Sequence, residues 1–67
     1  MKGLTIVHDE DHPGLLAEIT SLLEKEGIAV QDFAGISLGS TAVISFTVER
    51  YKTAFRLLSD AGYRVVA

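Results

Sequence analysis

The chain contains no cysteine, which excludes a disulfide framework and any metal site built on thiolates. It also has no tryptophan, one proline and two histidines, so its capacity to bind metal through imidazole is small. The absence of cysteine is compatible with a reducing compartment, and we expect a cytoplasmic protein. We expect neither a metal nor a cofactor.

Long apolar runs and clustered positive charges are also missing. No stretch approaches the ~20 apolar residues that a membrane-spanning helix needs. The first residues show no cleavage pattern of small side chains, so we read them as mature sequence and not as a signal peptide. The six basic residues are scattered and the net charge is −3, which argues against a nucleic-acid-binding surface. We therefore predict no membrane and no nucleic acid as a partner.

What is present is the composition of a folded domain, with 48% hydrophobic and 22% charged residues in 67 positions. A chain of this length forms one domain, over residues 1–67, and buries only roughly 60% of its unfolded surface. Domains this small usually need a disulfide, a metal or a partner for stability. Because the first two are not expected, we predict a homodimer or a higher homo-oligomer.

Hydrophobic periodicity predicts four strands and two helices in the order βαββαβ. Side chains alternate along the strand segments, and the first helix carries an apolar stripe made by Leu15, Leu16, Ile19, Leu22 and Leu23. We expect strands over 2–8, 28–38, 41–48 and 63–67, and helices over 13–26 and 50–61.

The helix ends have recognisable signals. Pro13 fits the first helical turn, and Asp11 or His12 would occupy the cap position, with Asp11 the better acceptor. Gly27 and Gly62 are expected to end the two helices in a left-handed conformation. The start of the second helix has no Ser, Thr or Asn at the cap.

Two features concern the predicted second strand. Gly39-Ser40 is a hairpin turn signal, and Gly35 marks either a bulge or a close approach of another backbone. Simple alternation puts Gln31 and Phe33 on the sheet face away from the helices.

The unit strand–helix–strand occurs twice, joined by this hairpin, which is the split βαβ or ferredoxin-like pattern. Right-handed crossovers then favour an α+β fold with a four-stranded antiparallel sheet in the order 4-1-3-2 and both helices on one face. Strands 2 and 4 would be the edges of the sheet.

The loop after the first strand holds the candidate ligand site. It leads into a helix N-terminus, where free N–H groups and the helix dipole favour anions. Gly14 would let a ligand approach those amides, and Asp11 could accept a hydrogen bond from an ammonium group. Together they could hold an amino-acid zwitterion, and Gly14→Val should then abolish binding and leave the fold intact. Alternatively, Pro13 and Gly14 only form a turn that Asp11 caps.

Metal binding and catalysis have weaker support in the same loop. His8 and His12 bracket three carboxylates, but the strand-to-loop geometry does not automatically bring the two imidazoles together, and the ligand set is mixed. The alternative is a solvated acidic loop. No nucleophile has a neighbouring base, so we predict no catalytic residues and no enzyme activity.

The segment Asp11–Ile19, with the sequence DHPGLLAEI, together with Gly27-Ile28 and the end of the second helix at Asp60–Tyr63, resembles the ACT domain. The resemblance extends over the whole chain through the βαββαβ order. It implies a regulatory module that binds amino acids or related effectors, and that pairs side by side into an eight-stranded sheet with the effector near the interface.

The resemblance also implies which residues contact the effector. They lie in the turn before the first helix and in the second strand of the partner copy: Asp11, His12, Pro13, Gly14, Leu15 and Leu16, with Ala29, Val30 and Gln31 from the other chain. Ala29 stands where many amino-acid-binding members have asparagine, and the turn is more acidic than in some members. The ligand could therefore differ, or the site could be empty.

The function expected from the sequence is allosteric sensing of an amino acid at a homodimer interface. The regulated output would be an enzyme or a transcription factor. The alternative is a ligand-free module for oligomerisation or protein interaction, in which the second strand pairs with a twin or with another protein.

Overall fold

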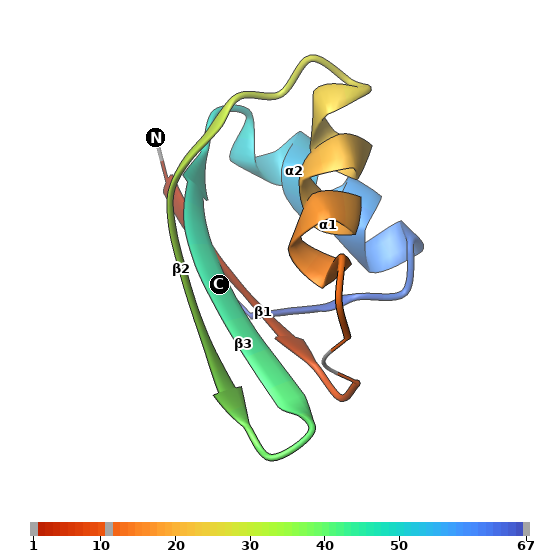
Figure 1. Ribbon diagram of the computed structural model, residues 1–67. Helices are drawn as coiled ribbons and strands as arrows, with labels where there is room; N and C mark the ends of the chain where they lie inside the picture. Colours follow the sequence, from red (N-terminus) through yellow and green to blue (C-terminus); the bar gives the residue numbers. More distant parts are fainter. Residues whose placement is uncertain (1, 11, 67) are drawn as a thin grey trace.

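The computed structural model describes residues 2–10 and 12–66. In these residues a four-stranded antiparallel sheet carries two helices on one face (Figure 1). The elements follow the predicted order: β1 (Lys2–His8), α1 (Leu15–Glu24), β2 (Val30–Leu38), β3 (Thr41–Val48), α2 (Tyr51–Asp60) and β4 (Arg64–Val66). Neither helix is long and apolar enough to cross a membrane, within the part of the chain described.

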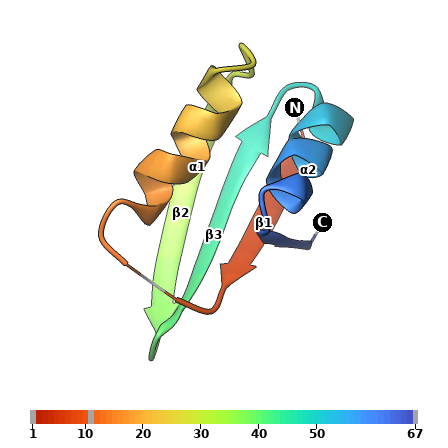
Figure 2. The same cartoon turned by 90° about the vertical axis from the view of Figure 1, so that its right-hand side faces the viewer.

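The strand order is β2-β3-β1-β4, which is the predicted order 4-1-3-2 read from the other edge. β1 lies in the middle and pairs antiparallel with both β3 and β4. Figure 2 shows α1 in front of the β2 side of the sheet and α2 in front of β1. The edge strand β2 therefore runs beneath the side of α1 that faces away from α2.

The core lies between the sheet and the helices. Every second residue of β3 is buried, as the alternation predicts. These side chains form one hydrophobic cluster with buried side chains of the other elements. The buried hydrophobic residues are Leu4, Ile6, Leu15, Ile19, Leu23, Ile28, Ala42, Ile44, Phe46, Val48, Ala54 and Leu58.

The apolar stripe of α1 is only partly buried, and one of its residues lies at the surface. Leu15, Ile19 and Leu23 are buried and Leu22 is half-buried, but Leu16 is 44% exposed. Leu16 sits at the flank of the stripe that faces β2, and the β2 side chains there do not cover it.

The start of α1 differs from the prediction. The helix begins at Leu15, after Pro13, and its N-cap is Gly14 with φ 89° and ψ −2° and no side-chain cap hydrogen bond. The expected cap by His12 is therefore wrong, and Asp11 lies outside the described residues. The positive φ of Gly14 turns the chain before a helical turn can include Pro13.

The ends of the helices agree with the predicted glycine signals. Gly27 has φ 71° and Gly62 has φ 97°. The residue after each glycine donates a backbone hydrogen bond to the carbonyl of the residue five positions earlier. The amide of Ile28 donates to the Leu23 carbonyl over 3.1 Å, and that of Tyr63 donates to the Leu58 carbonyl over 3.0 Å. These bonds satisfy carbonyls that the helix end leaves open, so both halves of the chain end their helix in the same way.

The start of α2 has no side-chain cap, as predicted, and its cap residue is strained. Arg50 occupies the N-cap with φ 44°, a left-handed conformation that is unfavourable for a residue with a side chain. Its guanidinium Nη2 donates to the carbonyl of Glu26 over 2.9 Å. The bond ties the start of α2 to the turn that ends α1.

β2 contains a bulge, but not at the predicted position. The register with β3 shifts between Gln31 and Ala34, and Asp32 has φ 57°, whereas Gly35 pairs regularly with Ile44. The extra residue reverses the alternation. Phe33 therefore lies on the helix side, 5.2 Å from Phe46 between ring centroids, and its predicted place on the opposite face is wrong.

Candidate functional site

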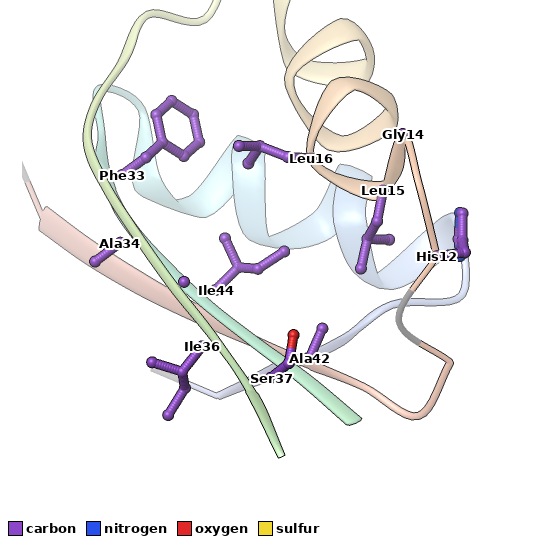
Figure 3. Close-up of a pocket in the computed structure, with 11 residues that line it drawn as sticks. His12, Gly14, Leu15, Leu16, Phe33, Ala34, Ile36, Ser37, Ala42 and Ile44 are labelled. Atoms are coloured by element: carbon purple, nitrogen blue, oxygen red, sulfur yellow. The ribbon is translucent and has the colours of Figure 1, made fainter. Parts of the chain in front are cut away.

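A pocket of about 380 Å³ opens between the N-terminus of α1 and the strands β2 and β3 (Figure 3). Its size is at the lower end of the range for small-molecule sites, about 300–1,000 Å³. Residues from the turn and α1 form one wall and residues from β2 the other. The lining residues are His12, Gly14, Leu15, Leu16, Phe33, Ala34, Gly35, Ile36, Ser37, Ala42 and Ile44.

The pocket exists because the residues of β2 that face α1 are small. After the bulge, Gly35 and Ser37 pair with Ile44 and Ala42, which are buried beneath the helices. Glycine, serine and alanine do not fill the space below α1. Figure 3 shows Leu16 and Phe33 on opposite sides of this space.

The amides at the start of α1 lie at the rim of the pocket. Leu15 N donates to His12 O over 3.2 Å, and Glu18 N donates to Gly14 O over 2.9 Å. For the N–H groups between them, those of Leu16 and Ala17, no backbone acceptor is found in residues 2–10 and 12–66. Amide donors without a backbone acceptor among these residues, at the positive end of a helix, favour an anion.

His12 stands beside these amides and is held at both ring nitrogens. Its Nε2 lies 2.9 Å from Glu18 Oε2, and its Nδ1 lies 3.1 Å from Glu10 O. The bond to Glu18 and the bond to the Glu10 carbonyl raise the pKa of His12 above its usual 6.5. When protonated, the imidazolium donates both bonds and places a positive charge near the rim of the pocket.

The pair formed by His12 and Glu18 predicts a pH-dependent stability. A raised folded-state pKa means that the stabilisation is complete below the unfolded pKa of about 6.5 and is lost as the pH rises through the folded pKa. His12→Gln should therefore lower the melting temperature more at about pH 5.5 than at about pH 8.5. Thermal melts of both proteins at the two pH values measure this difference, and Glu18→Gln should reproduce it. An equal loss at both pH values would contradict the prediction.

Of the turn residues expected in the site, four line the pocket: His12, Gly14, Leu15 and Leu16. Pro13 is exposed and does not line it, and Asp11 lies outside the described residues.

The three strand residues that the resemblance implies, Ala29, Val30 and Gln31, lie outside this pocket in the same chain. Their expected place is in a partner copy, so their role stays a prediction. Sequence reasoning missed the β2 and β3 residues of the pocket. The signal was present in the small side chains of Gly35, Ser37 and Ala42, but the bulge determines which face they occupy.

A second hollow, of about 530 Å³, lies at the ends of β1 and α2 and contains His8 and Tyr63. Their ring centroids are 5.3 Å apart, and partial burial, with a smaller effect of the charge of Glu18, raises the pKa of Tyr63. His8 and His12 approach to 6.1 Å between centroids. Among the described residues, however, no three His, Asp or Glu side chains are grouped to hold a metal ion.

The sequence matches no protein-family model, and a search of curated proteins gives no match. Solved structures do match. A protein from Bacteroides thetaiotaomicron superposes with a TM-score of 0.82 at 23% identity, over 96% of this chain and 44% of that one. The ligand-free regulatory subunit of aspartate kinase from Thermus thermophilus gives a TM-score of 0.80 at 23% identity, over 96% and 47%.

The chain thus spans less than half the length of these two proteins. The ACT domain of prephenate dehydrogenase from Bacillus anthracis is matched over 100% of its own length and 97% of this chain, with a TM-score of 0.81 at 21% identity. Element order, strand order and superposition agree, and this chain has the fold of an ACT domain.

Proposed function

We propose that this domain regulates a partner by binding a small effector, an amino acid, in the pocket beside the turn that opens α1. The observation that carries the proposal is the position of the pocket. It is lined by Gly14 and Leu16, next to the two N–H groups at the helix start that have no backbone acceptor among the described residues. A pocket of this size with two anion-binding donors at its rim fits a carboxylate ligand.

The turn residues then have separate roles. The amides of Leu16 and Ala17 bind the carboxylate of the effector. Gly14 leaves room for it, because a Cβ atom at this position would have nothing within 4 Å. Protonated His12 adds positive charge, which offsets the acidic side chains of Glu10 and Glu18. Asp11 keeps the role that the sequence suggests, as acceptor for the ammonium group.

A second copy of the chain would complete the site. β2 is a nine-residue edge strand, and Ile36 and Leu38 on it are 59% and 63% exposed. Unprotected edges of this kind readily pair with another strand. In an antiparallel β2–β2 pair, the beginning of one strand lies opposite the end of the other. Ala29, Val30 and Gln31 of the second copy would then come close to the pocket, which opens near Ser37.

Regulation follows from linkage. An effector that contacts both copies binds the dimer better than the separated chains, and it stabilises the dimer by RT ln(1 + [L]/Kd). The names of two similar structures, a regulatory subunit of aspartate kinase and an ACT domain of prephenate dehydrogenase, support an enzyme as the regulated partner. A transcription factor is the other output we consider, and the domain itself is proposed to be non-catalytic.

The second candidate function is assembly without a ligand. The observation that favours it is the exposure of β2, eight of whose nine residues are solvent-exposed. In that case the edge strand pairs with a twin, and the pocket has no effector.

Thermal melts with each of the twenty amino acids, combined with sedimentation, test the proposal. Saturation at about 100 times Kd contributes about 2.7 kcal/mol. For a domain of this size, the melting temperature should then rise by roughly 10–20 °C. A dimer that no amino acid stabilises would support the assembly function instead. A monomer that no amino acid stabilises would contradict both functions.

A further inference from the structure

We infer that the effector carries an aliphatic side chain of the size of valine, leucine, isoleucine or methionine, and that Gly35 sets the upper limit of that size. The inference rests on the proposed function and adds the chemical class of the ligand and a residue that determines specificity. It depends on three properties of the pocket, which are its floor, its charge and the space above Gly35.

Most side chains on the floor and walls of the pocket are apolar, and the polar ones are His12 and Ser37. Ala42 and Ile44 lie beneath it, and Leu16 and Phe33 face each other across it (Figure 3). Leu16 and Phe33 are 44% and 38% exposed, so each presents apolar surface at the pocket. An aliphatic group inserted there removes their apolar surface from water, at about 25 cal/mol for each Å².

The charges around the pocket argue against an effector with a charged side chain. Among the described residues that line the pocket, His12 alone is ionisable, and its two ring nitrogens are bonded to Glu18 and to the Glu10 carbonyl. The carboxylate of aspartate or the ammonium of lysine would have no charged partner on the floor. Burying a charge without a partner is costly, so both should be rejected.

Gly35 lies where a side chain would enter the pocket. It pairs with Ile44, whose side chain is buried under α1, so a Cβ atom at Gly35 points to the same side. That atom would lie 3.7 Å from Val43 O and 3.8 Å from Ile44 Cγ1, which are ordinary contacts, and φ at Gly35 is not positive. The backbone therefore accepts a larger residue at position 35, and the side chain of that residue would occupy part of the pocket.

The test compares Gly35→Leu with Gly3→Leu, a matched change on β1 outside the pocket, where φ is also not positive. Binding is followed by amide chemical shifts with four probes: leucine, aspartate, lysine and 4-methylpentanoate, which is leucine without its ammonium group. We expect leucine to bind and to shift the amides of Gly35 and Ile44. Gly35→Leu should weaken leucine binding at least 100-fold, and Gly3→Leu should leave it unchanged.

The outcomes separate the inference from the proposed function. Binding of aspartate or lysine at the start of α1, unaffected by Gly35→Leu, would overturn the inference and leave the proposed function standing. Binding of 4-methylpentanoate that is lost in Gly35→Leu, with no amino acid bound, would support the apolar pocket and contradict an amino-acid effector. If leucine, valine, isoleucine and methionine all leave these amides unshifted at millimolar concentration, the inference is overturned, and the proposed function is overturned as well if none of the twenty amino acids stabilises the protein.

Discussion

Replacement of Phe46 by alanine is expected to remove at least about a third of the stability of this domain. Phe46 is 2% exposed and is the largest fully buried side chain. Truncation of a buried phenylalanine costs about 3–5 kcal/mol, and a chain of this length has roughly 3–10 kcal/mol of stability in total. The melting temperature should fall by at least about 12 °C, as measured by circular dichroism.

Phe33→Ala is the matched control for this change. The ring of Phe33 packs on Phe46 but is 38% exposed at the rim of the pocket, so its removal leaves no closed cavity. We expect a loss of about 1 kcal/mol, mostly from the aromatic contact. If the two variants lose equal stability, the core is not centred on Phe46 as described.

Gly14→Val is expected to destabilise the fold as well as to abolish effector binding. Gly14 has φ 89°, and residues with a side chain lose about 1–2 kcal/mol in left-handed conformations. Chemical denaturation should show this loss in the absence of any ligand. From the sequence alone we expected an intact fold for this variant. The residue spacing does not reveal that φ at Gly14 is positive, and this conformation is the reason for the expected loss.

Gly3→Val makes the same chemical change at a different backbone conformation. Gly3 lies on β1 with φ outside the positive range, and a Cβ there would be 3.9 Å from Phe46 O. Valine is favourable in strands, so the stability should be unchanged or slightly higher. Equal stability of Gly14→Val and Gly3→Val would show that the turn before α1 relaxes to a negative φ without cost.

The order of elements, the order of strands and the glycine ends of the helices were all predictable, because each depends on neighbours in the chain. Alternation along β3 identifies Ile44 and Phe46 as core residues, and Gly27 and Gly62 end the helices through their own backbone freedom. A glycine before an apolar helix also pointed to the turn, four of whose six expected residues line the pocket.

The other wall of the site could not be predicted, because it depends on contacts between distant segments. The bulge at Asp32 is a mismatch between β2 and β3, and it moves Phe33 to the helix side. Leu16 was expected beside the effector, but Gly35 and Ser37, which lie on the opposite wall, were not.

The linear pattern of apolar residues and glycines was sufficient for the architecture of this protein, since periodicity and backbone freedom act within a few residues. The pocket arose only on folding. One extra residue in an edge strand changed which side chains face α1. Small side chains from two strands left a space beneath the helix, which a pattern of neighbouring residues cannot predict.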